Sequence, residues 1–171
     1  MPDDEPLPPY SYVPGGPWPH PISHPQGHWA GVRLPRPEPI ADGRWVESPA
    51  YLRGATLFNA GFYWEAHEVW EGLWHAHGRR GPTADLLKAL IKLAAAGVKV
   101  REGQPAGVAT HARRAAALLE NVRAQFGDRY LGLDLGALAT CARALEANPP
   151  VATASAGATV ARVLDFAIAP Q

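Results

Sequence analysis

A single cysteine, Cys141, is present among 171 residues, so no disulfide can form within the chain. Disulfides are rare in reducing compartments, and their absence here favours a cytoplasmic location. Positive and negative side chains number 16 each, so the chain has no basic excess to attract nucleic acid or an anionic membrane. We therefore expect neither nucleic-acid nor membrane partners.

No apolar run in the sequence is long enough to span a bilayer. The most apolar segment, residues 86–100, is short for a span and is interrupted by Lys88, Lys92 and Lys99. The first residues are acidic and proline-rich, without the basic start and apolar stretch of a secretory signal. These features also predict a cytoplasmic protein.

Proline is scarce after residue 49, because 13 of the 18 prolines lie at or before it. Proline fixes φ and lacks an amide donor, so residues 1–47 are predicted to form an extended arm. This arm contains Trp18, Trp29 and Trp45, and a purely solvated linker seldom has so many aromatic rings. We expect the arm to pack on a helical domain formed by residues 48–171.

The remainder of the chain carries helix signals, with no convincing alternation of period two, so strands are not expected. Caps, prolines and glycines predict five helices over 49–61, 62–77, 85–101, 105–126 and 135–147. Ser48, Thr83 and Asp134 are the expected N-caps. Apolar residues between Val160 and Ile168 suggest a sixth, weaker helix. The prediction is an all-α compact bundle of five to six helices, with Cys141 in its core.

Residues 58–74, FNAGFYWEAHEVWEGLW, are the most informative segment for function. They combine three carboxylates, one histidine and several large aromatic rings in a little over four helical turns. No lysine or arginine lies between Arg53 and Arg79 to neutralise these acids locally. The segment is therefore either an ordinary solvated acidic face or an enclosed polar site.

The helical wheel separates two faces of this segment. Six side chains form the core stripe: Phe62, Tyr63, Ala66, Val69, Trp70 and Leu73. Four polar side chains lie within an arc of about 100° on the opposite side: His67, Glu68, Glu71 and His75. Trp64 lies in this arc and Trp74 beside it, although a solvated face seldom displays two indoles. The acids also lack the lysine partners at i,i+4 that exposed helices usually have.

Enclosed carboxylates need partners, because unpaired burial of a charge is costly. Two later helices offer them, through Lys88, Lys92 and Lys99 and through His111, Arg113 and Arg114. A solvated stripe is the alternative interpretation of these lysines.

Two kinds of chemistry fit the polar arc. His67 and Glu71 are four residues apart and His75 is one turn further, a spacing at which one helix can present several ligands to a metal ion. The spacing does not match the zinc-protease or di-iron motifs. Alternatively, His67 and a neighbouring glutamate, Glu68 or Glu71, act as general acid and base. The sequence does not decide between the two, nor whether the protein is an enzyme.

The arm adds His20, His24 and His28 to these candidates. Prolines between them exclude a shared helix. One interpretation is a strap whose rings pack on the body. The other is that His20 or His28 folds over the second helix and completes its site.

Residues 57–74, LFNAGFYWEAHEVWEGLW, resemble the signature of the DUF309 family, small all-α bacterial and archaeal proteins of unknown function. Residues 87–96 are similar to the family's second block, although the family often has glycine and glutamine near Ala89 and Lys92. The resemblance implies a compact helical bundle with a motif centred on His67, Glu68, Glu71 and Trp74. It implies no substrate, cofactor or mechanism.

Our leading hypothesis is a small binding module whose polar cleft holds an ion or a small polar ligand. Trp64 and Trp74 would wall the cleft, while Asn59 and Tyr63 would position its turn and rim. Both of the latter have an alternative structural role, Asn59 in capping and Tyr63 in packing.

Two other hypotheses remain open at this point. A metal-assisted hydrolase would use His67 and Glu71 with His28 or His75, and a divalent metal would be its cofactor. A protein–protein adaptor would use the tetratricopeptide-like hairpin around Gly61. Self-association into a homo-oligomer through the alanine-rich later helices also stays open.

Overall fold

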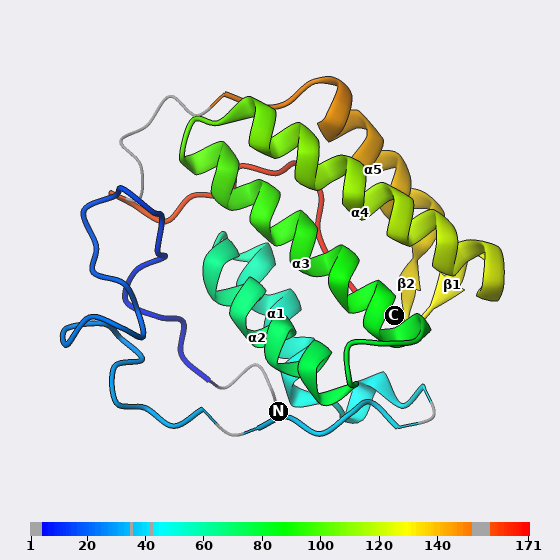
Figure 1. The fold of residues 1–171 in the computed structure, drawn as a ribbon, viewed down its shortest axis with the longest axis horizontal. Coiled ribbons are helices and arrows are strands. Elements are labelled where there is room, and N and C mark those ends of the chain that lie inside the picture. The colour runs from blue at the N-terminus through cyan, green and yellow to red at the C-terminus, as the bar shows by residue number, and fades with distance from the viewer. Residues whose placement is uncertain (1–4, 35, 42, 152–157) are drawn as a thin grey trace.

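The fold is a bundle of five α-helices, seen in a computed structural model that describes residues 5–34, 36–41, 43–151 and 158–171. The helices are α1 (Pro49–Asn59), α2 (Tyr63–Ala76), α3 (Pro82–Arg101), α4 (Pro105–Phe126) and α5 (Leu135–Ala147), and a short 3₁₀-helix, η2 (Trp45–Glu47), precedes α1. Each α-helix packs against its neighbour in sequence, so α2 and α4 both contact α3 (Figure 1). The predicted all-α class is confirmed.

Helix starts follow local chemistry at two of the three expected caps. The Ser48 side chain accepts a hydrogen bond from the Tyr51 amide, and Asp134 Oδ1 accepts one from the Ala137 amide at 2.8 Å. The prediction for Thr83 is wrong, because α3 already begins at Pro82, a residue that is well suited to the first helical turn. The Thr83 hydroxyl lies 2.9 Å from the Tyr130 hydroxyl instead.

A short hairpin joins α4 to α5, although no strand was expected from the sequence. Strands β1 (Arg129–Tyr130) and β2 (Leu133–Asp134) pair antiparallel, with Tyr130 opposite Leu133. Two-residue strands are too short to show alternation, which is why the sequence pattern missed them. The hairpin is anchored where the Tyr51 hydroxyl donates to the Leu131 carbonyl at 2.9 Å.

The expected sixth helix is absent from residues 158–171, which run extended along the bundle (red in Figure 1). Residues 152–157 of the same prediction lie outside the described part of the chain. Tyr63 Oη accepts hydrogen bonds from the Val163 and Leu164 amides at 2.9 and 3.2 Å. Asn59 bonds both backbone groups of Ile168. Side chains of α1 and α2 therefore satisfy tail groups that would otherwise bond within a helix.

Close packing centres on Trp70, which is fully buried between α1 and α2. Its Nε1 donates to the Tyr51 carbonyl at 3.1 Å. A Cβ at Gly54 would lie 2.2 Å from that nitrogen, so only glycine fits there. Cys141 is partly exposed at the edge of the core and not fully inside it as expected. Among the described residues, no helix combines the length and apolarity needed to cross a bilayer.

Candidate functional site

Three of the predicted site residues converge on the polar side of α2. His67, Glu68 and Glu71 each offer one ligand atom, and these atoms all lie within 4.8 Å of one another. His67 Nδ1 is 3.4 Å from Glu68 Oε1, and both side chains remain about a quarter exposed (28 % and 25 %). We refer to these three residues as the α2 cluster.

The α2 cluster has unused hydrogen-bonding capacity. His67 Nδ1 is buried and has no hydrogen-bond partner among the described residues. Within the same part of the chain, neither Glu68 nor Glu71 forms an ion pair with a lysine or arginine. The expected direct pairing with the next two helices is therefore not made in the described part of the protein.

Cations of α3 and α4 nevertheless influence the cluster at longer range. Burial lowers the pKa of Lys92, as do the charges of Arg114 and Lys88, whereas Glu71 acts in the opposite direction. Burial also lowers the pKa of His111 to about 4, assisted by Lys92 and other nearby positive groups that include His67. His111 is therefore neutral near pH 7, and its Nδ1 is buried without a partner among the described residues.

The other predicted cations are used elsewhere. Lys99 pairs with Glu102 at 2.8 Å. Lys88 lies over the ring of Trp74, 5.4 Å from its centroid. Arg113 is exposed at the surface of α4. The charge of Lys92, by contrast, interacts with Glu71.

His75 is not part of the α2 cluster, although its spacing suggested a further metal ligand. It is exposed, and its ring packs edge-on against Trp74 with centroids 5.2 Å apart. Trp74 is also covered by Arg79 and Lys88, at 5.9 and 5.4 Å from the ring. Trp74 therefore stacks on cations, a contact that needs no ligand.

The N-terminal arm covers the other indole, Trp64. The rings of Tyr12, His20 and Trp29 lie 5.3, 5.1 and 6.1 Å from the Trp64 ring. His20 Nδ1 accepts hydrogen bonds from two backbone amides of its own turn, those of residues 22 and 23. His20 therefore packs on α2 and does not complete the α2 cluster.

Asn59 and Tyr63, expected at the turn and rim of a cleft, bind the C-terminal tail instead. Both Asn59 side-chain atoms bond Ile168, at 2.7 and 2.8 Å. Tyr63 is almost fully buried (2 % exposed). These contacts support the structural alternative for both residues.

Glu65 is the residue that the sequence analysis missed. It is fully buried, and its carboxylate accepts hydrogen bonds from Ser11 Oγ at 3.1 Å and from the Tyr12 amide at 2.8 Å. Burial raises the pKa of Glu65 to about 7, although these hydrogen bonds act in the opposite direction. One signal was available, because helical geometry places Glu65 beside Phe62 and Val69 at the edge of the core stripe.

His28 faces this buried carboxylate and not the α2 cluster. Its Nε2 lies 3.7 Å from Glu65 Oε1, and neither ring nitrogen has a hydrogen-bond partner among the described residues. Burial lowers the pKa of His28. His28 of the arm therefore belongs to a polar group separate from the α2 cluster. This buried group is formed by Ser11, His28 and Glu65.

A family model described as "Domain of unknown function (DUF309)" matches residues 51–111. These residues belong to the DUF309 family. The DUF309 segment spans most of α1, all of α2 and α3, and the start of α4. It therefore contains the α2 cluster together with Lys92 and His111. No curated protein and no solved structure gives a significant match to the chain.

Proposed function

We propose that this protein is a small helical binding module whose α2 cluster binds a divalent metal ion through His67, Glu68 and Glu71. The supporting observation is the convergence of three ligand atoms within 4.8 Å of one another. Atoms bound to one ion at about 2.1 Å lie about 3 to 3.5 Å apart. Modest side-chain rotations would therefore bring the three atoms to ligating distance.

The composition of the cluster favours a particular class of metal. One imidazole nitrogen and two carboxylates suit zinc and transition metals such as manganese or iron, whereas calcium and magnesium prefer oxygen ligands alone. Three protein ligands leave coordination positions for water or a small polar ligand. A metal with such open positions could in turn bind a small molecule, as expected for a binding module.

The surrounding charges support a cation at this position. Glu68 and Glu71 lack ion pairs in the described part of the chain, and His111 is neutral near pH 7 because its pKa is lowered. Lys92 is the opposing feature, since its positive charge interacts with Glu71. A divalent ion would add more charge next to the two acids than Lys92 alone supplies.

A metal-assisted hydrolase is the second candidate, and His111 is the observation that favours it. Its buried Nδ1 has no hydrogen-bond partner among the described residues, and a positive charge on His67 contributes to the lowered pKa of His111. A neutral imidazole beside a metal with open positions could accept a proton from bound water. The adaptor hypothesis has less support, because arm residues and cations cover the two indoles that it would present.

Calorimetric titration of the metal-free protein with Zn²⁺ and Mn²⁺ tests this proposal. We expect saturable binding that His67→Ala and Glu71→Gln each weaken at least tenfold, since each removes one ligand. His75→Ala and Glu38→Gln are matched controls, because they remove the same kinds of group outside the cluster. Absence of saturable binding, or equal binding by all four variants, would overturn it.

A further inference from the structure

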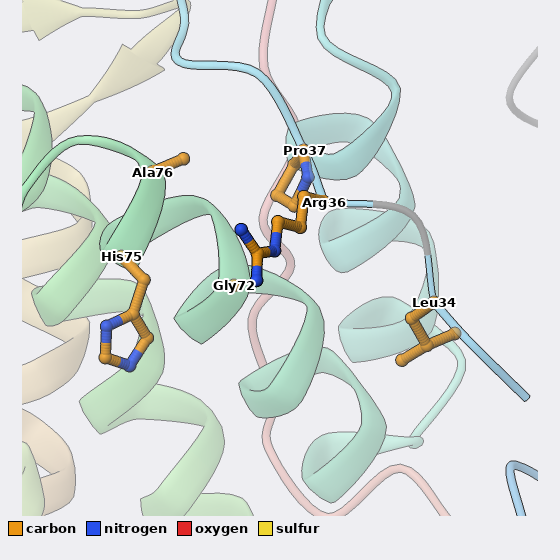
Figure 2. A pocket seen from close by; sticks show the side chains of 6 residues that line it. All are labelled: Leu34, Arg36, Pro37, Gly72, His75 and Ala76. Atoms are coloured by element: carbon orange, nitrogen blue, oxygen red, sulfur yellow. The ribbon is translucent and has the colours of Figure 1, made fainter. Parts of the chain in front are cut away.

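We propose that a hollow between the N-terminal arm and α2 binds a small organic carboxylate with an apolar body. The hollow measures about 470 Å³ and is lined by Leu34, Arg36 and Pro37 from the arm and by Gly72, His75 and Ala76 from α2 (Figure 2). Ligand sites commonly have volumes of about 300 to 1,000 Å³ and mostly apolar walls with a few polar groups. The hollow meets this description.

Arg36 supplies the charge that would hold a carboxylate. Arg36 lines the hollow, and its side chain extends from the arm toward α2 (Figure 2). It forms no ion pair with an acidic side chain of the described residues. No acidic side chain lines the hollow. The planar fork of arginine matches a carboxylate with two parallel hydrogen bonds.

Gly72 supplies the second observation, because the fold does not require a glycine at this position. Its φ is not positive, and an added Cβ would make ordinary contact with Pro37 at 3.7 and 3.8 Å. The helical glycines Gly54 and Gly97 differ, since a Cβ there would lie 2.2 and 2.5 Å from aromatic side chains. Glycine inside a helix is unfavourable. At Gly72 its effect is to leave the floor of the hollow open.

The apolar residues that line the hollow favour a ligand with an apolar portion next to its carboxylate. Leu34 and Pro37 form one wall, and Ala76 extends the floor by one helical turn from Gly72. His75 also lines the hollow, while its ring packs edge-on against Trp74. A chain of about six carbons or a single aromatic ring would fit within such a space while its carboxylate faces Arg36.

Hexanoate is the probe for this site, followed by proton–nitrogen NMR of the full-length protein in a buffer containing a metal chelator. We expect saturable shifts of the Gly72, His75 and Ala76 amides. Acetate, which lacks the apolar body, and 1-hexanol, which lacks the charge, should each bind much more weakly. Hexanoate shifts that do not saturate, or equal binding of 1-hexanol, would overturn the proposal.

Variants then assign the two parts of the site. Arg36→Gln should weaken hexanoate binding about tenfold, as expected for loss of a charge-assisted pair. Arg33→Gln removes the same charge from a neighbouring arm residue outside the hollow and should bind as the wild type does. Equal effects of the two substitutions would contradict a specific role for Arg36.

Gly72→Leu should abolish hexanoate binding by filling the floor, and Gly72→Ala should weaken it while retaining the fold, because its methyl group fits without displacement. Unchanged affinity in Gly72→Ala together with unchanged affinity in a folded Gly72→Leu would overturn the assignment. The site is independent of the metal site. Zinc binding should therefore persist in Gly72→Ala, so failure of one proposal leaves the other testable.

Discussion

His28 Nε2 lies 3.7 Å from Glu65 Oε1, with the histidine side chain 6 % exposed and the carboxylate fully buried. One residue belongs to the proline-rich arm and the other to α2, 37 positions later in the chain. Ser11 and Tyr12 bond the same carboxylate from another part of the arm. Glu65 is thus the point at which two separate arm segments are held on the helical domain.

Removing this carboxylate should loosen the arm. Glu65→Ala leaves the buried Ser11 hydroxyl and the partly buried Tyr12 amide without an acceptor and should lower the free energy of unfolding by about 3 kcal/mol. Glu65→Gln keeps an acceptor and should cost less. Urea denaturation measures both, with Glu38→Ala as the exposed control, expected within about 0.5 kcal/mol of the wild type. A Glu65→Ala protein as stable as the control would contradict the role of Glu65.

The raised pKa of Glu65 predicts a pH dependence of stability with a defined sign. The folded state holds the proton to about pH 7, whereas the unfolded carboxyl titrates near 4.5. Protonated Glu65 therefore makes its full contribution to the free energy of unfolding below about pH 4.5. As the pH rises to about 7, this contribution is lost, and the free energy of unfolding falls by about 3 kcal/mol.

The difference between wild type and Glu65→Gln measures this effect together with the interaction between Glu65 and His28, which lie 3.7 Å apart. His28 acts with the opposite sign, because its lowered pKa reduces stability as the pH falls below 6.5. Parallel stability curves for the two proteins between pH 4.5 and 7 would show that Glu65 titrates normally.

Two glycine substitutions should have opposite effects on stability. Gly54→Ala places a methyl group in the volume of the Trp70 indole and should destabilise the fold by about 1 to 3 kcal/mol. Gly72→Ala meets no such obstacle and should stabilise α2 by up to about 1 kcal/mol. Thermal unfolding of the two variants provides the comparison. Equal changes would contradict the packing described around Gly54.

The C-terminal tail should depend on the Tyr63 hydroxyl. Tyr63→Phe leaves the Val163 and Leu164 amides without their acceptor, at a cost of about 1 to 2 kcal/mol. Hydrogen exchange of these two amides should accelerate more than that of the α3 amides. Tyr12→Phe is the control, because the Tyr12 hydroxyl makes no hydrogen bond within the described residues. Unchanged exchange in Tyr63→Phe would contradict this anchoring.

The helices could be predicted because their signals are local. Ser48 and Asp134 bond amides within their own first turns, and prolines and glycines set the other ends. The polar arc was also predictable, since helical geometry alone places Glu71 one turn from His67. The sequence did not predict that His75 lies outside the α2 cluster, because its position depends on the contact between the His75 and Trp74 rings.

The arm and the tail could not be predicted in the same way. Their positions depend on contacts between residues far apart in sequence, such as Ser11 with Glu65 and Ile168 with Asn59. The spacing of apolar residues in the tail is typical of a helix. The tail amides nevertheless donate hydrogen bonds to side chains of α1 and α2. Local pattern contains no information about such long-range acceptors.

Nitrogen NMR of the histidine rings during a zinc titration tests the central claim most directly. Metal binding at the α2 cluster predicts that the His67 ring nitrogens shift to metal-bound values and saturate near one ion per chain, whereas those of His75 stay unchanged. Glu71→Gln should weaken the same transition. If the His67 ring does not respond, or if His75 responds alone, the α2 cluster is not a metal site.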